Sequence, residues 1–95
     1  MRFPDLNLLI AMDILLEEQS VTGAAQRMNM SPAAMSRTLA RIREAIGDPV
    51  LVRAGRRLVP TARGIEMRGQ VKKTIEDAIA LMQPAVLERL DGLRR

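Results

Sequence analysis

Residues 21–40 read VTGAAQRMNMSPAAMSRTLA, and this stretch holds the strongest local structural signals in the 95-residue chain. Ser31 is suited to cap a helix, and Pro32 suits the first helical position because its missing N–H would have no partner there. Asn29 tolerates the left-handed backbone that a sharp turn requires. Thr22 is expected to cap a shorter helix before that turn. The stretch therefore predicts two helices joined by a tight turn, which is the helix-turn-helix arrangement.

The second of these helices is predicted to run from Pro32 to about Ile46, with Gly47 as its C-terminal cap. Its apolar residues repeat at helical spacing and form one buried stripe, which leaves the opposite face exposed. In helix-turn-helix proteins, the early exposed residues of the second helix reach base edges in the major groove. The buried stripe is Met35, Leu39, Ile42 and Ile46, and the candidates for DNA contact are Ser31, Pro32, Ala33, Ser36, Arg37, Ala40 and Arg41.

The candidate side chains differ in what they can bind. Arg37 can bond guanine or a phosphate, and Ser36 can donate or accept a hydrogen bond. The methyl groups of Ala33 and Ala40 can pack on thymine methyls. Thr22 and the open N–H groups at its helix start suit a phosphate of the DNA backbone.

The apolar segments 50–53 and 58–60 flank Ala54-Gly55-Arg56-Arg57, and this pattern predicts a small β-hairpin with a basic tip. Such a hairpin after a recognition helix is the wing of a winged helix-turn-helix, and its tip lies on an adjacent minor groove. Arginine is favoured in a narrow minor groove by the negative potential there. The wing candidates are Arg53, Arg56 and Arg57. For Arg53, an ordinary surface charge or a partner for Asp48 is an equally open interpretation.

The first helix is predicted between Leu6 and about Glu18, with Asp5 as its cap. Together with the two helices of the quoted stretch and the hairpin, it completes a mostly α-helical, winged helix-turn-helix domain over residues 1–60. Residues 61–95 are predicted to form a second region, a long linker and dimerisation helix.

Thr61 is expected to cap this last helix, which continues to about Leu90 unless Pro84 kinks it or ends it near Gln83. Its apolar residues repeat at spacings of three and four, which suits helix–helix pairing. Ile65 is expected to pack on the chain's own domain near the wing, whereas the distal residues have few local partners. The predicted dimerisation residues are Val71, Ile75, Ile79, Met82, Val86 and Leu90.

The composition excludes several functional classes. The chain has 15 Lys and Arg against 11 Asp and Glu, and ten of the basic residues but only three of the acidic ones lie between residues 37 and 73. It has no Cys and no His, so Cys/His zinc sites and His-dependent catalysis are impossible. Phe3 is the only aromatic residue, which argues against the base stacking of single-strand and RNA readers. We therefore expect no metal, no cofactor and no enzymatic activity.

The sequence also allows a prediction of the cellular compartment of the protein. No apolar run approaches the roughly 18–20 residues of a membrane span. The start, MRFPDLNLL, lacks the long apolar stretch and the cleavage site of a signal peptide. We expect a cytoplasmic protein that makes no membrane contact.

Three stretches form a specific combination: SVTGAA at 20–25, MSPAAMSR at 30–37 and GRRLVPT at 55–61. With them, the region from residue 5 to about residue 66 closely resembles the N-terminal domain of LysR-type transcriptional regulators. The opening DLNLL resembles the branch of this family that includes nodulation regulators. One departure is Pro32-Ala33, because many members carry Gln-Pro after the capping Ser and read bases with that Gln. The resemblance does not extend to this base contact.

The resemblance implies a winged helix-turn-helix, a linker helix that pairs two subunits, and binding to interrupted inverted repeats in promoters. It also implies that a small-molecule effector acts only through a larger C-terminal domain, which would begin about where this chain stops. We expect a short module that binds double-stranded DNA sequence-specifically, as a homodimer or higher homo-oligomer through the linker helix. The alternative is a helical protein-interaction module that dimerises through the C-terminal helix. This alternative explains the seam over residues 71–90 but not the arginine-rich centre.

Overall fold

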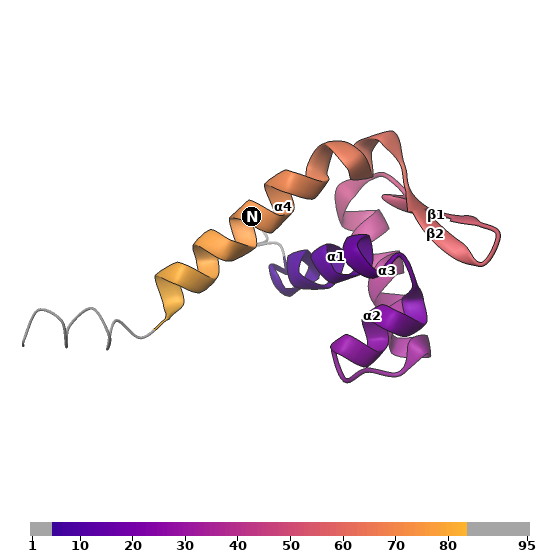
Figure 1. Cartoon of the computed structure of the whole chain (residues 1–95), viewed down its shortest axis with the longest axis horizontal. Helices are drawn as coiled ribbons and strands as arrows, with labels where there is room; N and C mark the ends of the chain where they lie inside the picture. Colours follow the sequence, from indigo (N-terminus) through magenta and orange to yellow (C-terminus); the bar gives the residue numbers. More distant parts are fainter. Residues whose placement is uncertain (1–4, 84–95) are drawn as a thin grey trace, which may run out of the picture.

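The computed structural model describes residues 5–83, and most of them are helical. Three helices gather together, a two-stranded hairpin projects on one side, and a long helix extends away on the other (Figure 1). The elements are α1 (Asn7–Glu18), α2 (Val21–Arg27), α3 (Pro32–Ile46), β1 (Leu51–Ala54), β2 (Arg57–Pro60) and α4 (Ala62–Met82). The predicted fold class is confirmed: three helices and a hairpin wing, followed by a long helix.

The core lies where α1, α2 and α3 meet. The small side chains of Ala24 and Ala25 are fully buried on α2, so the neighbouring helices can approach it closely. The inner face of α3 carries the predicted apolar stripe, and burying that face leaves the outer face of the helix in solvent. The stripe consists of Met35, Leu39 and Ile42, which are buried, and Ile46, which is half-buried.

The helix ends of α3 and α4 follow their sequence signals. The Oγ of Ser31 accepts a hydrogen bond from the N–H of Ala34 at 3.1 Å, which confirms the predicted cap of α3. Thr61 caps α4 in the same way, by accepting from the N–H of Gly64 at 3.0 Å. Gly47 ends α3 in the left-handed conformation with φ of 75°, also as predicted.

The predicted cap of α2 is wrong. Ser20 caps this helix by accepting a hydrogen bond from the N–H of Gly23 at 3.0 Å, and Thr22 lies inside the first turn. The reason is the residue before the cap, since Gln19 adopts a left-handed conformation with φ of 53° and ends α1 there. The chain therefore turns directly into α2, two residues earlier than the sequence predicts.

The hairpin pairs β1 with β2 in an antiparallel register. Leu51 and Leu58 are buried and attach the base of the hairpin to the helices. Only Gly55 and Arg56 form the turn, with φ of 64° at Gly55. Arg57 was expected at the tip, but it belongs to strand β2.

The hairpin starts from a strained residue. Val50 is fully buried and has φ of 64°, a conformation that β-branched residues rarely adopt. Its N–H donates to Oδ2 of Asp48 at 2.7 Å, and its carbonyl accepts from the N–H of Thr61 at 2.9 Å. Gly64 lies so close to the same carbonyl that a Cβ at this position would overlap the oxygen. The start of α4 is therefore fixed against the base of the wing.

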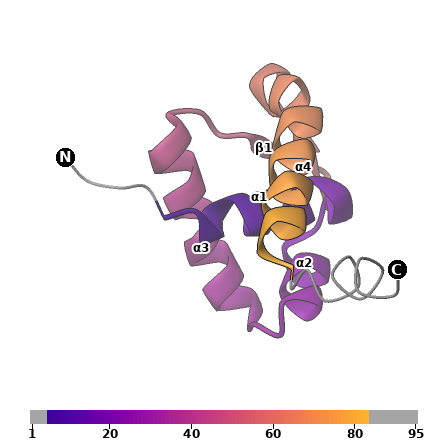
Figure 2. The same cartoon turned by 90° about the vertical axis from the view of Figure 1, so that its left-hand side faces the viewer.

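Helix α4 crosses α1 (Figure 2), and its first half packs on the core. Val71 is only 4% exposed in this contact, so its prediction as a dimerisation residue is wrong. Ile65 is 63% exposed, so its predicted packing on the chain's own domain is also wrong. A repeating apolar seam does not by itself distinguish the residues that face the chain's own core from those that face solvent.

Helix α4 ends at Met82, and Gln83 after it is extended. This end agrees with the effect predicted for Pro84, so the prediction of one helix continuing to residue 90 is wrong. With 21 residues, α4 is about 30 Å long. Val86 and Leu90, the last two predicted dimerisation residues, lie outside the described residues.

We expect Gly64→Ala to lower the free energy of unfolding by about 1–3 kcal/mol, because the added Cβ would overlap the carbonyl oxygen of Val50. Gly69→Ala is the matched control in the same helix. No atom lies within 4 Å of its new Cβ, and better helix propensity should stabilise the chain by up to about 1 kcal/mol. Urea denaturation followed by circular dichroism measures both variants. Equal effects at the two glycines would contradict the close packing at Gly64.

Candidate nucleic-acid interface

The outer face of α3 and its cap residue expose every side chain that the sequence predicts for DNA contact by the recognition helix. Thr38 lies at the edge of this face, half-buried, and its hydroxyl donates to the carbonyl of Ala34 at 3.0 Å, so it serves the helix itself. Ser31 already accepts a hydrogen bond as the cap, and its hydroxyl proton remains free to donate. The exposed set is Ser31, Pro32, Ala33, Ser36, Arg37, Ala40 and Arg41.

Arg37 and Arg41 share this face but differ in their surroundings. Arg41 forms an ion pair with Oδ2 of Asp5 at 2.9 Å. The sequence predicts Asp5 as the cap of α1, and its carboxylate does bond the start of this helix, although Leu6 is the residue directly before Asn7 and has no side-chain cap of its own. The carboxylate of Asp5 accepts from the N–H of Asn7 at 3.0 Å and from Arg41, and these bonds, in that order, lower its pKa. Arg37 has no such partner within residues 5–83.

The wing exposes three arginines, Arg53 on β1, Arg56 in the turn and Arg57 on β2. The interpretation of Arg53 as a partner for Asp48 is wrong. The carboxylate of Asp48 accepts from the N–H of Val50 at 2.7 Å and from the hydroxyl of Thr61 at 2.8 Å, and these two bonds lower its pKa. Asp48 therefore holds the base of the wing rather than an arginine of the wing.

The third wing arginine, Arg57, is exposed but hydrogen-bonds another part of the chain. The guanidinium of Arg57 donates to Oε1 of Gln19, at the junction between α1 and α2. Thr22 is exposed in the first turn of α2, as a contact to a phosphate would require. The structure thus leaves Thr22 open to solvent but engages Arg57, which the sequence predicts as a DNA contact.

Most of the basic residues between positions 37 and 73 are engaged inside the chain. Arg43 donates to the carbonyls of Pro49 at 3.0 Å and Leu51 at 2.7 Å, and Arg68 donates to the carbonyl of Leu16 at 3.2 Å. Sequence reasoning missed these roles because a backbone carbonyl carries no signal of its own in the sequence. Among residues 5–83, three arginines have neither an ion pair nor a hydrogen bond to the chain, and we call them the unpaired arginines: Arg37, Arg53 and Arg56.

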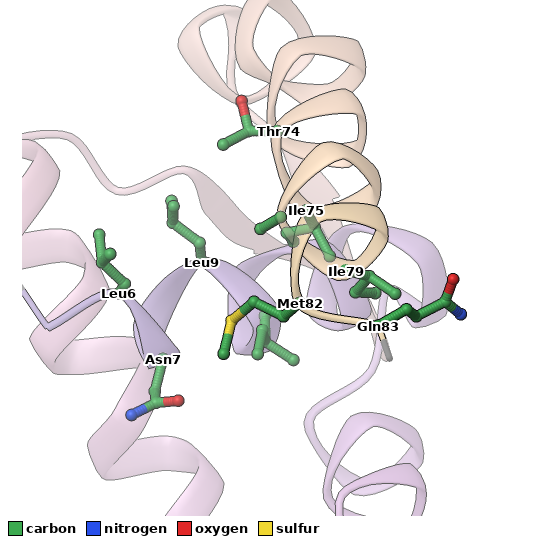
Figure 3. Close-up of a pocket in the computed structure, with 10 residues that line it drawn as sticks. Leu6, Asn7, Leu9, Thr74, Ile75, Ile79, Met82 and Gln83 are labelled. Atoms are coloured by element: carbon green, nitrogen blue, oxygen red, sulfur yellow. The ribbon is translucent and has the colours of Figure 1, made fainter. Parts of the chain in front are cut away.

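A groove of about 550 Å³ runs between α1 and α4 (Figure 3). Three predicted dimerisation residues line it, namely Ile75, Ile79 and Met82. The opposite wall comes from Leu6, directly before α1, and Ile10 on α1, which sequence reasoning missed. Their spacing of four residues on the outer face of α1 was the available signal. Several residues that line the groove are exposed to solvent: Leu6 is 65% exposed and Met82 is 82% exposed.

An ion-pair network at the end of α1 joins three helices. Arg27 of α2 lies 2.7 Å from Glu17 and 3.1 Å from Glu18, while Lys72 of α4 contacts Glu17 and lies 3.1 Å from Asp13. Hydrogen bonds from Lys72 and then Arg27 lower the pKa of Glu17 from 4.5 to about 2. The same carboxylates raise the pKa of Lys72 and Arg27. The network favours the observed placement of α4 across α1.

The part of the chain that the structure describes has no helix long and apolar enough to cross a membrane. Within the same residues, no three acidic side chains gather as a metal site would require. What the described residues do bring together is a solvent-facing recognition helix, an arginine-bearing wing and a linker helix. These parts define a winged helix-turn-helix protein of the DNA-binding kind.

The chain belongs to the lysR family of bacterial regulatory helix-turn-helix proteins, whose sequence profile matches residues 6–65. Nodulation protein D 2 of Sinorhizobium fredii is 44% identical over 77 residues, which are 79% of this chain and 25% of that protein. The predicted resemblance to nodulation regulators is confirmed by this relative. The chain spans about a quarter of the length of the curated relatives that it matches. Family and fold together support a DNA-binding transcriptional regulator.

Two solved structures show the same fold. A probable transcriptional regulator from Pseudomonas aeruginosa has a TM-score of 0.74 at 30% identity and covers 85% of this chain and 28% of its own. The BenM DNA-binding domain, solved in complex with catB site 1 DNA, has a TM-score of 0.78 at 23% identity. This second likeness covers 93% of this chain and 97% of that domain, so it includes the linker helix as well as the wing.

Glu17 predicts a specific pH dependence of stability. Because its pKa is lowered on folding, its ionised form stabilises the fold above about pH 4.5, and that contribution is lost as the pH falls toward 2. We expect Glu17→Gln to lower the free energy of unfolding at pH 7 and to flatten its decline between those pH values. Glu44→Gln, at an exposed carboxylate without an ion pair among residues 5–83, is the matched control. Urea denaturation across the pH range measures this, and parallel curves for Glu17→Gln and the unaltered chain would contradict it.

Proposed function

We propose that this chain binds double-stranded DNA sequence-specifically in the cytoplasm, as a homodimer at an inverted-repeat promoter site, without any enzymatic step. The observation that carries the proposal is the location of the unpaired arginines of residues 5–83, at the start of α3 and on the wing. A helix in the major groove and a wing on the minor groove need cationic side chains at those two places.

In the proposed complex, the start of α3 enters the major groove. Arg37 bonds a guanine edge or a phosphate, and Ser36 bonds a base edge beside it. The small Ala33 and Ala40 let the helix axis approach the bases and can contact thymine methyls. Arg41 reaches DNA only if it leaves the carboxylate of Asp5, so we assign it a secondary contact.

The flanking contacts in this proposal position the protein on the duplex. Arg56 in the wing turn enters the minor groove, where a narrow groove concentrates negative potential. Arg53 on β1 and Thr22 at the start of α2 contact phosphates on the two sides of the recognition helix. Phosphate contacts fix register and orientation, while the bases are read by α3.

The proposed dimer uses the groove between α1 and α4. An exposed apolar surface that includes Leu6, Ile10, Ile79 and Met82 is of the kind that marks an interaction site. A second copy related by a two-fold axis would present the same residues and bury both surfaces. Two-fold pairing also gives two recognition helices, which is the arrangement that an inverted repeat requires.

The second candidate function is a helical protein-interaction module, and the same apolar groove is the observation that favours it. Such a module would use the groove for a partner and would leave the outer face of α3 without a role. DNA binding accounts for both surfaces, so we prefer it.

Selection of bound sequences from a random duplex library tests the proposed function. We expect an enriched site with two symmetric halves, because a two-fold dimer reads each half with one copy of α3. Affinity for the selected duplex should fall roughly 10³-fold or more between about 50 and 200 mM salt if six or more phosphates are contacted. No enrichment and a flat salt response would favour the protein-interaction module.

The selected duplex also tests the role of Arg37. Arg37→Ala should weaken binding to it by about 1–3 kcal/mol if the side chain reads a base. Arg63→Ala is the matched control, because Arg63 pairs with Glu66 on α4 at 3.1 Å and lies outside the proposed interface. An equal loss on random duplex would show that Arg37 contacts a phosphate instead.

The groove predicts where the dimer is sensitive to charge. Ile79→Glu combined with Met82→Glu should abolish the dimer, because two carboxylates would be buried in the apolar interface. Ile65→Glu is the control, since Ile65 is exposed on the same helix but does not line the groove. Sedimentation analysis measures both variants. An unchanged dimer after the double substitution would contradict this interface.

A further inference from the structure

One residue between α1 and α2, Gln19, makes two hydrogen bonds to strand β2 of the wing. Two consecutive residues of β2 bond to Gln19: the guanidinium of Arg57 donates to its side-chain Oε1, and the N–H of Leu58 donates to its backbone carbonyl at 3.0 Å. Each strand of the wing has only four residues, and a two-stranded hairpin of that length does not hold a fixed direction alone. The direction of the wing therefore depends on these anchors and on the buried leucines at its base.

Gln19 is itself held firmly in place. Its N–H donates to the carbonyl of Leu15 at 2.8 Å, and its left-handed backbone ends α1 immediately before Ser20 caps α2. Arg68 of α4 donates to the carbonyl of Leu16 one turn earlier. Cationic groups are favoured at this position because the C-terminal end of a helix carries partial negative charge.

We propose that Gln19 and Arg57 are positioning residues that set the direction of the wing relative to α3. Arg56 at the tip is the neighbour of Arg57, so the anchor lies one residue from the proposed minor-groove contact. The guanidinium of Arg57 is exposed but bonded to Gln19, and in this proposal it does not contact DNA, unlike those of Arg53 and Arg56. This inference rests on the DNA binding proposed above.

The main test is a double-mutant cycle between Gln19 and Arg56 on the selected duplex. Gln19→Gly removes the side-chain acceptor but keeps the carbonyl bond to Leu58, and glycine favours the left-handed conformation at a helix end. We expect it to weaken binding by roughly threefold to tenfold when Arg56 is present and by less than about twofold in the Arg56→Ala background. Equal losses in both backgrounds would overturn the proposal, because Gln19 would then not act through the wing tip.

The salt dependence of the affinity for DNA tests the assignment that Arg57 does not contact DNA. Arg57→Ala should weaken binding as much as Gln19→Gly, and the two changes together should be no worse than either alone, because they break one interaction. The slope of affinity against salt should stay unchanged for Arg57→Ala, and it should fall by about one for the matched control Arg53→Ala. A comparable fall in slope for Arg57→Ala would show a phosphate contact and would overturn the assignment.

A measurement without DNA separates this inference from the proposed function. Backbone order parameters from NMR relaxation should fall at Gly55 and Arg56 in Gln19→Gly, while the thermal midpoint of unfolding shows that the variant is folded. Unchanged order parameters would overturn the anchoring role even if DNA binding is intact. A failed library selection would overturn the proposed function, and a drop in wing order would still support the anchor.

Discussion

The contact between the carbonyl of Val50 and the start of α4 fixes the wing and the linker helix at once. Strand β1 begins directly after Val50, and α4 begins directly after Thr61, whose N–H donates to that carbonyl. Gly64 lies against the same oxygen, so β1 and α4 both start at this contact and cannot shift relative to each other. The left-handed conformation of Val50 costs on the order of 1–3 kcal/mol. It persists because hydrogen bonds with neighbouring residues, including Asp48, hold the backbone in place.

The uneven distribution of charge along the sequence is explained largely by contacts within the chain. The sequence shows an arginine-rich centre, but within residues 5–83 most of these cations hold carbonyls or carboxylates of the chain. Arg43 bonds the chain before and within β1, Arg68 bonds the end of α1, and Lys72 joins α4 to Glu17. An exposed ion pair such as Lys72–Glu17 contributes only about 0–1 kcal/mol, so it favours an orientation rather than holds the fold together. The unpaired arginines are the cations that face away from the chain.

Sequence patterns predicted the structural features that depend on residues close together in the chain. They failed where the interacting residue is distant in the sequence. Ser31 caps α3 because its own neighbours satisfy the cap, and the pattern of that helix separates an inner from an outer face. Ser20 and Thr22 are both residue types that cap helices, and the left-handed residue that ends α1 decides between them. Val71 has the spacing of a pairing seam, yet α1 covers it within the chain. Arg57 has its acceptor 38 residues away, where no sequence pattern shows it.

Helix α1 connects the two surfaces on which the proposed function depends. Ile10 and the preceding Leu6 line the groove that we assign to the dimer. At the other end, Glu17 bonds α2 and α4, and Gln19 directly after the helix bonds the wing. Twelve residues of helix span only about 18 Å and bend little, so the dimer axis and the reading surface are joined by a nearly rigid element. In such an arrangement, the separation of the two recognition helices follows from the angle at which α4 crosses α1. That angle depends on the close approach at Gly64 and on the carboxylates that hold Lys72. In the proposed dimer, the half-site spacing of the DNA would therefore be set by packing inside each subunit as much as by the interface between subunits.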